Sequence, residues 1–304
     1  MLIYQGERIA VWTVDAGRLR LDGGAMFGVV PKPLWERRIE ADDRNRIPLA
    51  MRCLYVEAED TRILVDTGIG DKEGEKFRRI YGIENDGKPT RLHDSLRELD
   101  VEPEDIDMVV NTHLHFDHAG GNTVLDDAGE ARPAFPNARY VVRRGEWAFA
   151  HRENERIQAS YLRHNFDPLE EAGVLELVDE DREVAPGVRL VRTPGHTPHH
   201  QSVLLGEGED LLFYLADLVP TTAHVSLPWI MGFDVEPLET LETKREILSR
   251  AGREGWVLLF EHDPEVAYGW AKPVDGDGCE LASPVTDDAV PHSGDPDDEG
   301  SPAS

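Results

Sequence analysis

The stretch Thr112-His113-Leu114-His115-Phe116-Asp117-His118, directly after a short apolar run, carries the strongest evidence about the fold. Side chains two residues apart in an extended chain face the same side, so His113 and His115 can reach one metal ion together. Asp117 and His118 follow at a turn, where their diverging side chains can serve a second ion. Imidazole and carboxylate ligands suit zinc, and an open coordination position makes a zinc site catalytic. The alternative is a His-rich surface loop without metal, which the preceding buried strand disfavours.

The composition indicates an acidic globular protein. The chain has 304 residues, 40% of them hydrophobic, which is enough for one large domain or two small ones. Its 60 acidic and 32 basic residues give a net charge of -28, which repels nucleic-acid phosphates and anionic membrane surfaces. A solvated acidic surface or a high-salt cytoplasm would both explain this charge. Residues 1–10 lack a long apolar run, so we expect no signal peptide, no membrane span and a cytoplasmic location.

The composition changes near the C-terminus. Residues 274–304 hold nine acidic residues, no Lys or Arg, and many Gly, Pro and Ser. Such a segment cannot bury enough apolar surface to offset its ordering entropy, so we expect a disordered acidic tail after one domain at residues 1–273. Cys53 lies in an apolar stretch and is expected to be buried, whereas Cys279 lies in this tail, so no disulfide framework is indicated.

Hydrophobic patterns predict a mixed α/β chain. Strands are predicted at residues 9–14, 51–56, 62–66, 106–111, 139–142, 188–192, 202–205, 211–216 and 256–260. Helices are predicted at residues 72–80, 94–99, 146–151, 155–163 and 238–250. Two sheets packed face to face with helices outside would fit this order. One doubly wound parallel sheet would give a similar string.

The His-X-His-X-Asp-His run resembles the metallo-β-lactamase superfamily, over most of residues 1–270. The resemblance implies a four-layer αββα sandwich. In that family an Asp at the end of an earlier strand braces the metal-binding loop, and Asp66 in Arg62–Gly68 matches it. Three further matches follow in order: His196 after Pro-Gly, Asp217 after an apolar strand, and His262 after another.

The resemblance implies a dinuclear centre. His196 would join His113 and His115 at the first ion, and His262 would join the second set. The implied metal ligands are His113, His115, Asp117, His118, His196, Asp217 and His262. The cofactors would be two divalent ions, with zinc favoured, bridged by Asp217. Such ions lower the pKa of a shared water from ~15.7 toward ~7 and polarise a carbonyl or phosphoryl oxygen.

Three residues are candidates for catalysis beyond this. Asp117 and Asp217 are candidates at the ions, and Asp217 is placed to hold the hydroxide and move a proton. His224 could donate a hydrogen bond to the substrate oxygen, or could be structural. His199 and His200 suit turn or supporting roles, and four other histidines are expected at the surface: His93, His151, His164 and His292.

The motif spacing is closest to the acyl-homoserine lactonase and organophosphate hydrolase branch, which implies cleavage of an ester or lactone bond in a small-molecule substrate. β-Lactamases of the superfamily usually have Cys at the Asp217 position, which argues against lactam cleavage. The lactonases often have a Tyr where this chain has Pro220. Phosphotriester or thioester hydrolysis and a catalytically inactive metal-binding protein are the alternatives. A homodimer is left open.

A Gly-rich, partly apolar segment at residues 22–28 resembles the early loop that leans over the metals in this family. Six apolar side chains are therefore pocket candidates: Met26, Phe27, Phe116, Trp147, Phe149 and Trp229. Ordinary core packing is the alternative for each.

Overall fold

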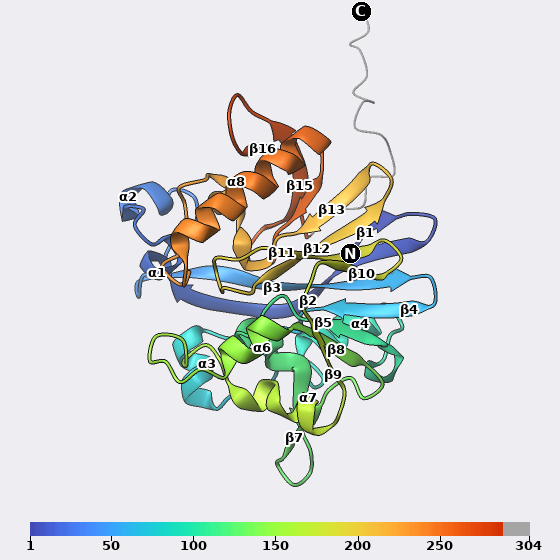
Figure 1. Cartoon of the computed structure of the whole chain (residues 1–304). Helices are drawn as coiled ribbons and strands as arrows, with labels where there is room; N and C mark the ends of the chain where they lie inside the picture. Colours follow the sequence, from blue (N-terminus) through green and yellow to red (C-terminus); the bar gives the residue numbers. More distant parts are fainter. Residues whose placement is uncertain (288–304) are drawn as a thin grey trace, which may run out of the picture.

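Two seven-stranded mixed sheets packed face to face form the centre of the molecule, with helices on the outer faces (Figure 1). The computed structural model describes residues 1–287. The first sheet contains, in spatial order, β1 (Leu2–Gln5), β2 (Ile9–Asp22), β3 (Arg46–Ala58), β4 (Thr61–Val65), β5 (Met108–Val110), β8 (Arg139–Arg143) and β9 (Leu175–Val178). The second contains β10 (Arg182–Ala185), β11 (Val188–Arg192), β12 (Gln201–Glu207), β13 (Asp210–Tyr214), β14 (Val257–Leu259), β15 (Val266–Pro273) and β16 (Cys279–Thr286). The predicted sandwich is therefore confirmed, and a single doubly wound sheet is excluded.

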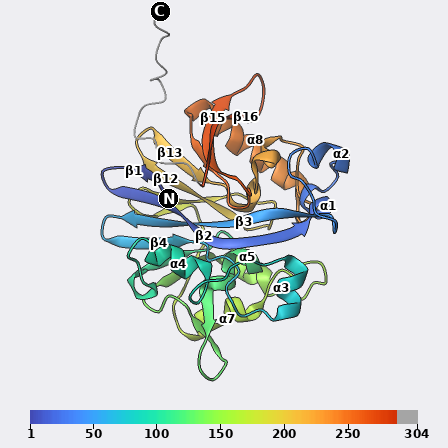
Figure 2. The same ribbon diagram turned by 180° about the vertical axis from the view of Figure 1, so that it is seen from behind.

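The helices are short except for α8. They are α1 (Gly23–Phe27), α2 (Lys32–Trp35), α3 (Glu75–Tyr81), α4 (Arg91–Arg97), α5 (Phe116–Ala119), α6 (Arg144–Ala150), α7 (Asp167–Glu171) and α8 (Pro237–Glu254). Single 3-10 turns are η1 (Pro103–Asp105), η2 (Gly120–Asn122), η3 (Arg163–Asn165), η4 (Ala216–Leu218) and η5 (Thr222–Val225). A hairpin of β6 (Thr123–Leu125) and β7 (Ala131–Pro133) forms a separate small sheet. The view from behind shows α3, α4 and α7 below the first sheet and α8 beyond the second (Figure 2).

The four layers follow from strands that are apolar on both faces. In β4, Ile63 and Val65 point into the core between the sheets, while Leu64 points toward the outer helices. In β13, Tyr214 faces the inter-sheet core and Phe213 packs toward α8. Successive strand residues face opposite sides, so a continuous apolar run fits only a strand covered on both faces. Burial of each such side chain stabilises the folded state by about 1.5–3 kcal/mol relative to leaving it exposed to water.

Most predicted elements are confirmed, with one helix wrong. All nine predicted strands overlap observed ones, and β2 and β3 extend well past their predicted ends. The predicted helix at residues 155–163 is instead a series of turns ending in η3. This segment buries Ile157 and Tyr161, and the Ser160 carbonyl accepts a hydrogen bond from the Phe116 amide at 2.9 Å. Tertiary contacts with the metal-binding loop therefore override its helix propensity.

The predicted disordered tail at residues 274–304 includes a strand, so its predicted start at residue 274 is wrong. β16 covers residues 279–286 and pairs antiparallel with β15, with Ala271 opposite Leu281. β16 is an edge strand, so it needs only one partner and tolerates Pro284. Asp287 also pairs with the buried guanidinium of Arg52. The rest of the expected tail, residues 288–304 with His292, lies outside the described residues.

Within residues 1–287, no helix is both long and apolar enough to cross a membrane.

Candidate metal centre

The seven predicted ligands gather at one edge of the sandwich, where strand ends from both sheets meet. β5 runs parallel to β4, and His113 follows it two residues beyond Asn111. β13 runs parallel to β14, so Asp217 and His262 come off neighbouring strand ends. His196 lies in the turn between β11 and β12, whose antiparallel pairing brings it to the same edge. The site is thus assembled from distant segments by strand pairing.

The first group comprises His113, His115, His196 and Asp217, all of them buried, with ligand atoms within 4.8 Å of one another. His196 Nε2 lies 3.0 Å from Asp217 Oδ2 and 3.1 Å from His115 Nδ1. His113 Nε2 lies 3.8 Å from the same Asp217 oxygen. Three ring nitrogens and one carboxylate oxygen therefore converge on a single point.

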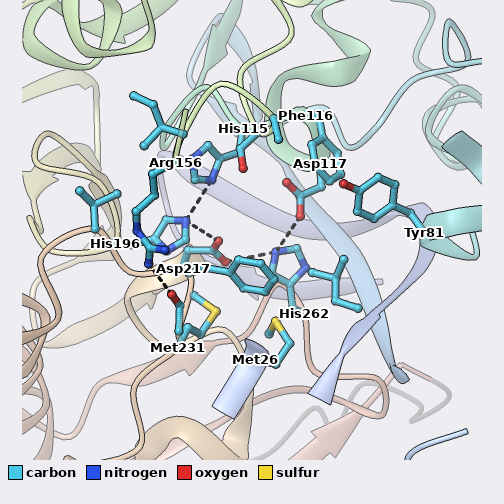
Figure 3. Close-up of a pocket in the computed structure, with 17 residues that line it drawn as sticks. Met26, Tyr81, His115, Phe116, Asp117, Arg156, His196, Asp217, Met231 and His262 are labelled. Atoms are coloured by element: carbon cyan, nitrogen blue, oxygen red, sulfur yellow. Dashed lines mark hydrogen bonds and ion pairs between the residues drawn. The ribbon is translucent and has the colours of Figure 1, made fainter. Parts of the chain in front are cut away.

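The second group comprises Asp117, His118 and His262. His262 Nε2 lies 3.2 Å from His118 Nε2. It also lies 3.1 Å from Asp217 Oδ1 (Figure 3). The two Asp117 oxygens lie 4.0 Å from His118 Nε2 and 3.9 Å from His262 Nε2. Asp217 Oδ2 faces the first group and also lies 3.5 Å from His118 Nε2, while Oδ1 faces His262, so Asp217 links the two groups.

The hydrogen-bond partners of the outer ring nitrogens indicate that the inner nitrogens are free to bind cations. His262 Nδ1 donates to the Ala50 carbonyl at 2.7 Å, and His196 Nδ1 faces the Asp234 carboxylate at 2.9 Å. His118 Nδ1 likewise faces carboxylate oxygens at 3.1 Å. Each neutral ring therefore points an Nε2 lone pair inward. Lone pairs facing one another at about 3 Å repel unless a proton or a metal ion lies among them, and the buried His113 Nε2 has no hydrogen-bond partner within residues 1–287.

The charges of the site point the same way. Although burial opposes protonation, Asp217 raises the pKa of His196 to about 10 and that of His262 to about 9. Burial lowers the pKa of His113 and of His115 well below the usual value, so these rings are neutral at pH 7. A cation can replace the protons on the first pair and be bound directly by the second.

Asp66 braces the metal-binding loop, as predicted. Its carboxylate accepts from the Thr112 amide at 2.8 Å and from the Thr112 hydroxyl at 2.7 Å, and it faces His118 Nδ1. Asp66 adopts a left-handed backbone conformation, with φ 56°, which few non-glycine residues do. Glu261, also fully buried, lies 3.1 Å from the same His118 nitrogen, and burial raises its pKa.

Two carboxylates that sequence reasoning missed support the other side of the site. Glu146 is fully buried and accepts hydrogen bonds from the Leu114 amide, the Tyr161 hydroxyl and the Thr197 hydroxyl. It therefore joins the loops on either side of His115 and His196. Asp234, the partner of His196, is the second. No local pattern marks either residue, because each acts only through loops that the fold brings together.

Glycines permit the close approach of these loops. Gly195 has φ 139°, and a Cβ there would lie 2.3 Å from the Thr240 hydroxyl oxygen at the start of α8. A Cβ on Gly121 would lie 2.2 Å from the Thr67 carbonyl oxygen. Gly195 sets the turn that presents His196, and Gly121 lets the metal-binding loop pack on the end of β4.

A cavity of about 260 Å³ opens over both groups. Its floor contains His115, Asp117, His196, Asp217 and His262. Its walls are mostly apolar and are formed by Leu21, Met26, Tyr81, Phe116, Arg156, Ile157, Ala159, Ser160, Met231, Gly232, Phe233 and Val235. Figure 3 shows Tyr81 beside Asp117, and Arg156 on the opposite side near His196.

The six apolar residues predicted to line the pocket fall into two groups, those that line the cavity and those that pack in the core. Met26 and Phe116 line the cavity, but Phe27, Trp147, Phe149 and Trp229 do not. These four belong to or pack against the hydrophobic core. Their apolar character predicted burial without distinguishing core from cavity.

The expectation for His224 is also corrected. Its Nδ1 pairs with the Thr221 hydroxyl at 2.8 Å, its Nε2 pairs with the Met26 carbonyl at 2.9 Å, and its ring stacks on Phe27. Both nitrogens are therefore occupied, and His224 positions the Met26 segment instead of reaching substrate. His93, expected at the surface, is buried and pairs with Thr90, whereas His151 and His164 are part-exposed and pair with carboxylates.

A buried lysine holds the loop that carries part of the wall. The Lys244 ammonium, from α8, donates to the carbonyls of His224, Ser226, Leu227 and Trp229 at 2.7–3.3 Å. Burial lowers the pKa of Lys244 to about 7. This ammonium organises the loop that leads to the wall residues Met231 and Phe233.

Comparisons with known proteins agree with this geometry. Residues 48–262 match the family described as the Metallo-beta-lactamase superfamily. An N-acyl homoserine lactonase of Bacillus cereus is 30% identical over 85% of this chain and 95% of its own length. Another from a Bacillus species is 31% identical over 73% and 85%. The crystal structure of a probable metal-dependent hydrolase from Staphylococcus aureus, 29% identical, covers 94% of this chain and 100% of its own, with a TM-score of 0.84.

Proposed function

The chain belongs to the metallo-beta-lactamase superfamily and is a metal-dependent hydrolase, and from this premise we propose that it uses two zinc ions to hydrolyse lactones and carboxylic esters. One observation carries the proposal: two buried ligand groups share Asp217 at the floor of an apolar cavity. Lone pairs at these separations need protons or metal ions between them, and the buried His113 Nε2, which has no hydrogen-bond partner within residues 1–287, favours a metal ion.

In this proposal the residues that would hold the first ion are His113, His115 and His196, and those that would hold the second are Asp117, His118 and His262. Asp217 would be shared between the two. When bound, two divalent cations supply hydroxide at neutral pH and polarise the oxygen of the bond to be cleaved. The mostly His and carboxylate donor set favours zinc over magnesium or calcium, which prefer oxygen ligands alone.

The residues of the chain orient the reactants and move protons. Asp217 and Asp117 both line the cavity, so their carboxylates can take a proton from the attacking water and return one to the leaving oxygen. The water oxygen bonds to the carbonyl carbon, the carbon–oxygen single bond breaks, and the leaving oxygen is protonated. Buried partners outside the ligand set hold the rings of His113, His118, His196 and His262, so the chain needs little rearrangement during the reaction.

The cavity supports a small neutral substrate with an apolar acyl group. Met26, Phe116, Ile157, Met231 and Phe233 provide apolar contacts close to the floor. Two relatives that match over most of their length are N-acyl homoserine lactonases, which supports a lactone bearing an acyl chain as the substrate class.

Zinc content and a substrate panel test the proposal together. The purified full chain, reconstituted with zinc and freed of excess metal, should hold close to two ions per chain by elemental analysis. It should hydrolyse N-acyl homoserine lactones and simple carboxylic esters ahead of β-lactams, thioesters and phosphotriesters. A stoichiometry fixed at one ion would overturn the dinuclear assignment. Preferred turnover of phosphotriesters or thioesters would overturn the assigned substrate class.

A further inference from the structure

Three polar side chains line the cavity in addition to the proposed ligands: Tyr81, Arg156 and Ser160. Arg156 donates to the Gly232 carbonyl at 2.8 Å and lies on the His196 side of the cavity (Figure 3). Tyr81 lies on the opposite side, with its hydroxyl directed toward Asp117. A substrate bound over the floor would therefore meet Tyr81 at the end where the second ligand group lies.

The fold fixes the Tyr81 ring against the metal-binding loop. Tyr81 is the last residue of α3, which ends because Gly82 adopts a left-handed conformation, with φ 55°. Its ring packs against Phe77, one turn earlier, at 4.5 Å, and against Phe116 at 4.9 Å between centroids. Phe116 stands between His115 and Asp117 in sequence, so any movement of the loop moves the aromatic cluster with it.

Tyr81 is half-buried, and its hydroxyl differs from those of four buried tyrosines. Those of Tyr55, Tyr140, Tyr161 and Tyr214 each donate to a carboxylate or a carbonyl of the chain. Within residues 1–287 no hydrogen bond involves the Tyr81 hydroxyl, although it faces a cavity. A phenol is protonated at neutral pH, so this group is a donor available to a bound molecule.

The segment after Asp217 supplies no competing donor. Pro220 has none, and Thr221 and His224 are paired with each other at 2.8 Å. The ionised Asp117 and Asp217 accept hydrogen bonds, and the ligand rings point their free nitrogens at the ion positions. Of the two hydroxyl groups among the lining residues, those of Tyr81 and Ser160, the Tyr81 hydroxyl is the one directed toward Asp117, where it can reach a substrate oxygen near the second ligand group.

We propose that Tyr81 is a catalytic residue whose hydroxyl donates a hydrogen bond to the carbonyl oxygen of the bound lactone or ester. This inference rests on the proposed hydrolase function. As the new carbon–oxygen bond forms, the electron pair of the carbonyl bond moves onto that oxygen, and a donor aimed there stabilises the growing charge. Tyr81 keeps its proton throughout, and the leaving oxygen receives its proton from Asp117.

Tyr81→Phe tests the hydroxyl while keeping the ring. We expect kcat to fall at least about tenfold. Removing one hydrogen-bond donor to such an oxygen typically lowers kcat by about 10²–10³-fold, and the effect should be smaller here because two cations would also stabilise the charge. The fall should be similar for an N-acyl homoserine lactone and a 4-nitrophenyl ester, because both share the carbonyl. Zinc content should equal that of the unchanged chain. The analogue in which an amide replaces the ester of the lactone ring should resist cleavage and can measure binding alone. In isothermal titration calorimetry, zinc-loaded Tyr81→Phe should bind this lactam with a Kd about 3- to 10-fold higher than that of the unchanged chain.

Two further variants separate the hydroxyl from packing. Tyr268→Phe removes a hydroxyl that likewise has no hydrogen bond within residues 1–287 and lies outside the cavity, so it should leave all values unchanged. Tyr81→Leu removes the ring as well. Full activity in Tyr81→Phe with a loss only in Tyr81→Leu would show a packing role and overturn the inference. A fall for the lactone alone would move Tyr81 to the leaving oxygen, which also overturns it. If the unchanged chain cleaves neither substrate, the proposed function itself fails and the inference falls with it.

Discussion

The floor and the wall of the cavity are built in different ways. The floor comprises the seven proposed ligands with the buried groups that hold them, and the wall comprises the remaining lining residues. Four of the five ligand rings have a buried partner outside the ligand set: the Thr112 hydroxyl, Asp66, Asp234 and the Ala50 carbonyl. The wall comes from α1, the end of α3, the 155–160 turns and the 230–235 loop, where Arg156 makes a single hydrogen bond.

This difference separates chemistry from selectivity. A floor with satisfied hydrogen bonds keeps ligand positions fixed, which a metal centre requires. A wall made of short loops with apolar contacts can change shape or sequence without disturbing the ions. Floor substitutions should therefore lower kcat and metal content together. Wall substitutions should leave metal content intact and change KM and substrate preference, and among the wall residues Tyr81, the proposed hydrogen-bond donor, should also affect kcat.

The largest effect should come from the residue common to both ligand groups. Asp217→Asn keeps the shape but removes the charge that faces His196 and His262. We expect kcat to fall about 10³-fold or more, since charge stabilisation by bound metal is worth several kcal/mol. Zinc analysis should show fewer than two ions. Asp210→Asn, an exposed carboxylate at the start of β13, the strand that precedes Asp217, is the control. Normal turnover with two ions in Asp217→Asn would contradict the role of Asp217.

The sequence predicts the floor far better than the wall. Ligands His113 to His118 are contiguous because one strand end delivers them, and His196, Asp217 and His262 each follow a recognisable turn or strand. The wall residues Tyr81, Arg156 and Met231 follow no such signal. Their positions depend on which loops the sandwich brings over its edge, and apolar residues such as Trp147 look the same in a core as in a cavity.

Edge strands and turns limited the fold prediction in a similar way. The segment at 279–286 is polar, yet it pairs along β15 and buries part of Leu281 and Cys279 against α8. Composition over the whole of residues 274–304 concealed one half-buried strand. Glu261 and Glu146 were also missed, because buried carboxylates are recognised only through the partners they meet.

Removing β16 should destabilise the chain and weaken the contacts that support His262. A chain ending at Pro273 lacks Asp287, which pairs with Arg52, and Arg52 donates to the carbonyls of Phe260 and Asp263 beside His262. We expect the free energy of unfolding to drop by about 3 kcal/mol or more, because the edge strand is lost and the buried guanidinium of Arg52 loses its carboxylate partner. Urea titration measures it, and a chain ending at Asp287 is the control. Equal stability of the two truncated chains would show that β16 is dispensable.

Zinc uptake should depend steeply on pH because of the floor. In the metal-free site the pKa of His196 is about 10 and that of His262 about 9, so both rings hold protons at neutral pH. Zinc must displace these protons, and its apparent affinity should rise with pH up to about 10, the pKa of His196. The rise should be roughly tenfold per pH unit for each proton displaced. Competition with a chelator at pH 6.5–9 measures this, and pH-independent affinity after correction for the chelator would contradict it.

The partner of His196 should have an intermediate effect. Asp234→Asn keeps a hydrogen-bond acceptor but removes the charge facing His196 Nδ1. We expect zinc affinity or kcat to fall by about 10- to 100-fold, as for other residues that orient a ligand histidine. Glu236→Gln, an exposed carboxylate two residues away, should change neither. If both variants behave alike, the floor does not depend on this contact.

The smallest effect should come from the wall residue Arg156. Its guanidinium donates to the Gly232 carbonyl, and within residues 1–287 no carboxylate lies within ion-pair distance of it. Arg156→Gln should leave kcat and zinc content unchanged, because no floor contact is lost. For a lactone with a neutral acyl chain, KM should change by less than about threefold. For one with a terminal carboxylate, KM should rise up to about fivefold, the range of an exposed ion pair, and the rise should shrink at high salt. Arg152→Gln, on the same segment but outside the cavity, is the matched control. A loss of kcat or of zinc in Arg156→Gln would show that this part of the wall also holds the floor, and the division between the two regions would then fail at that point.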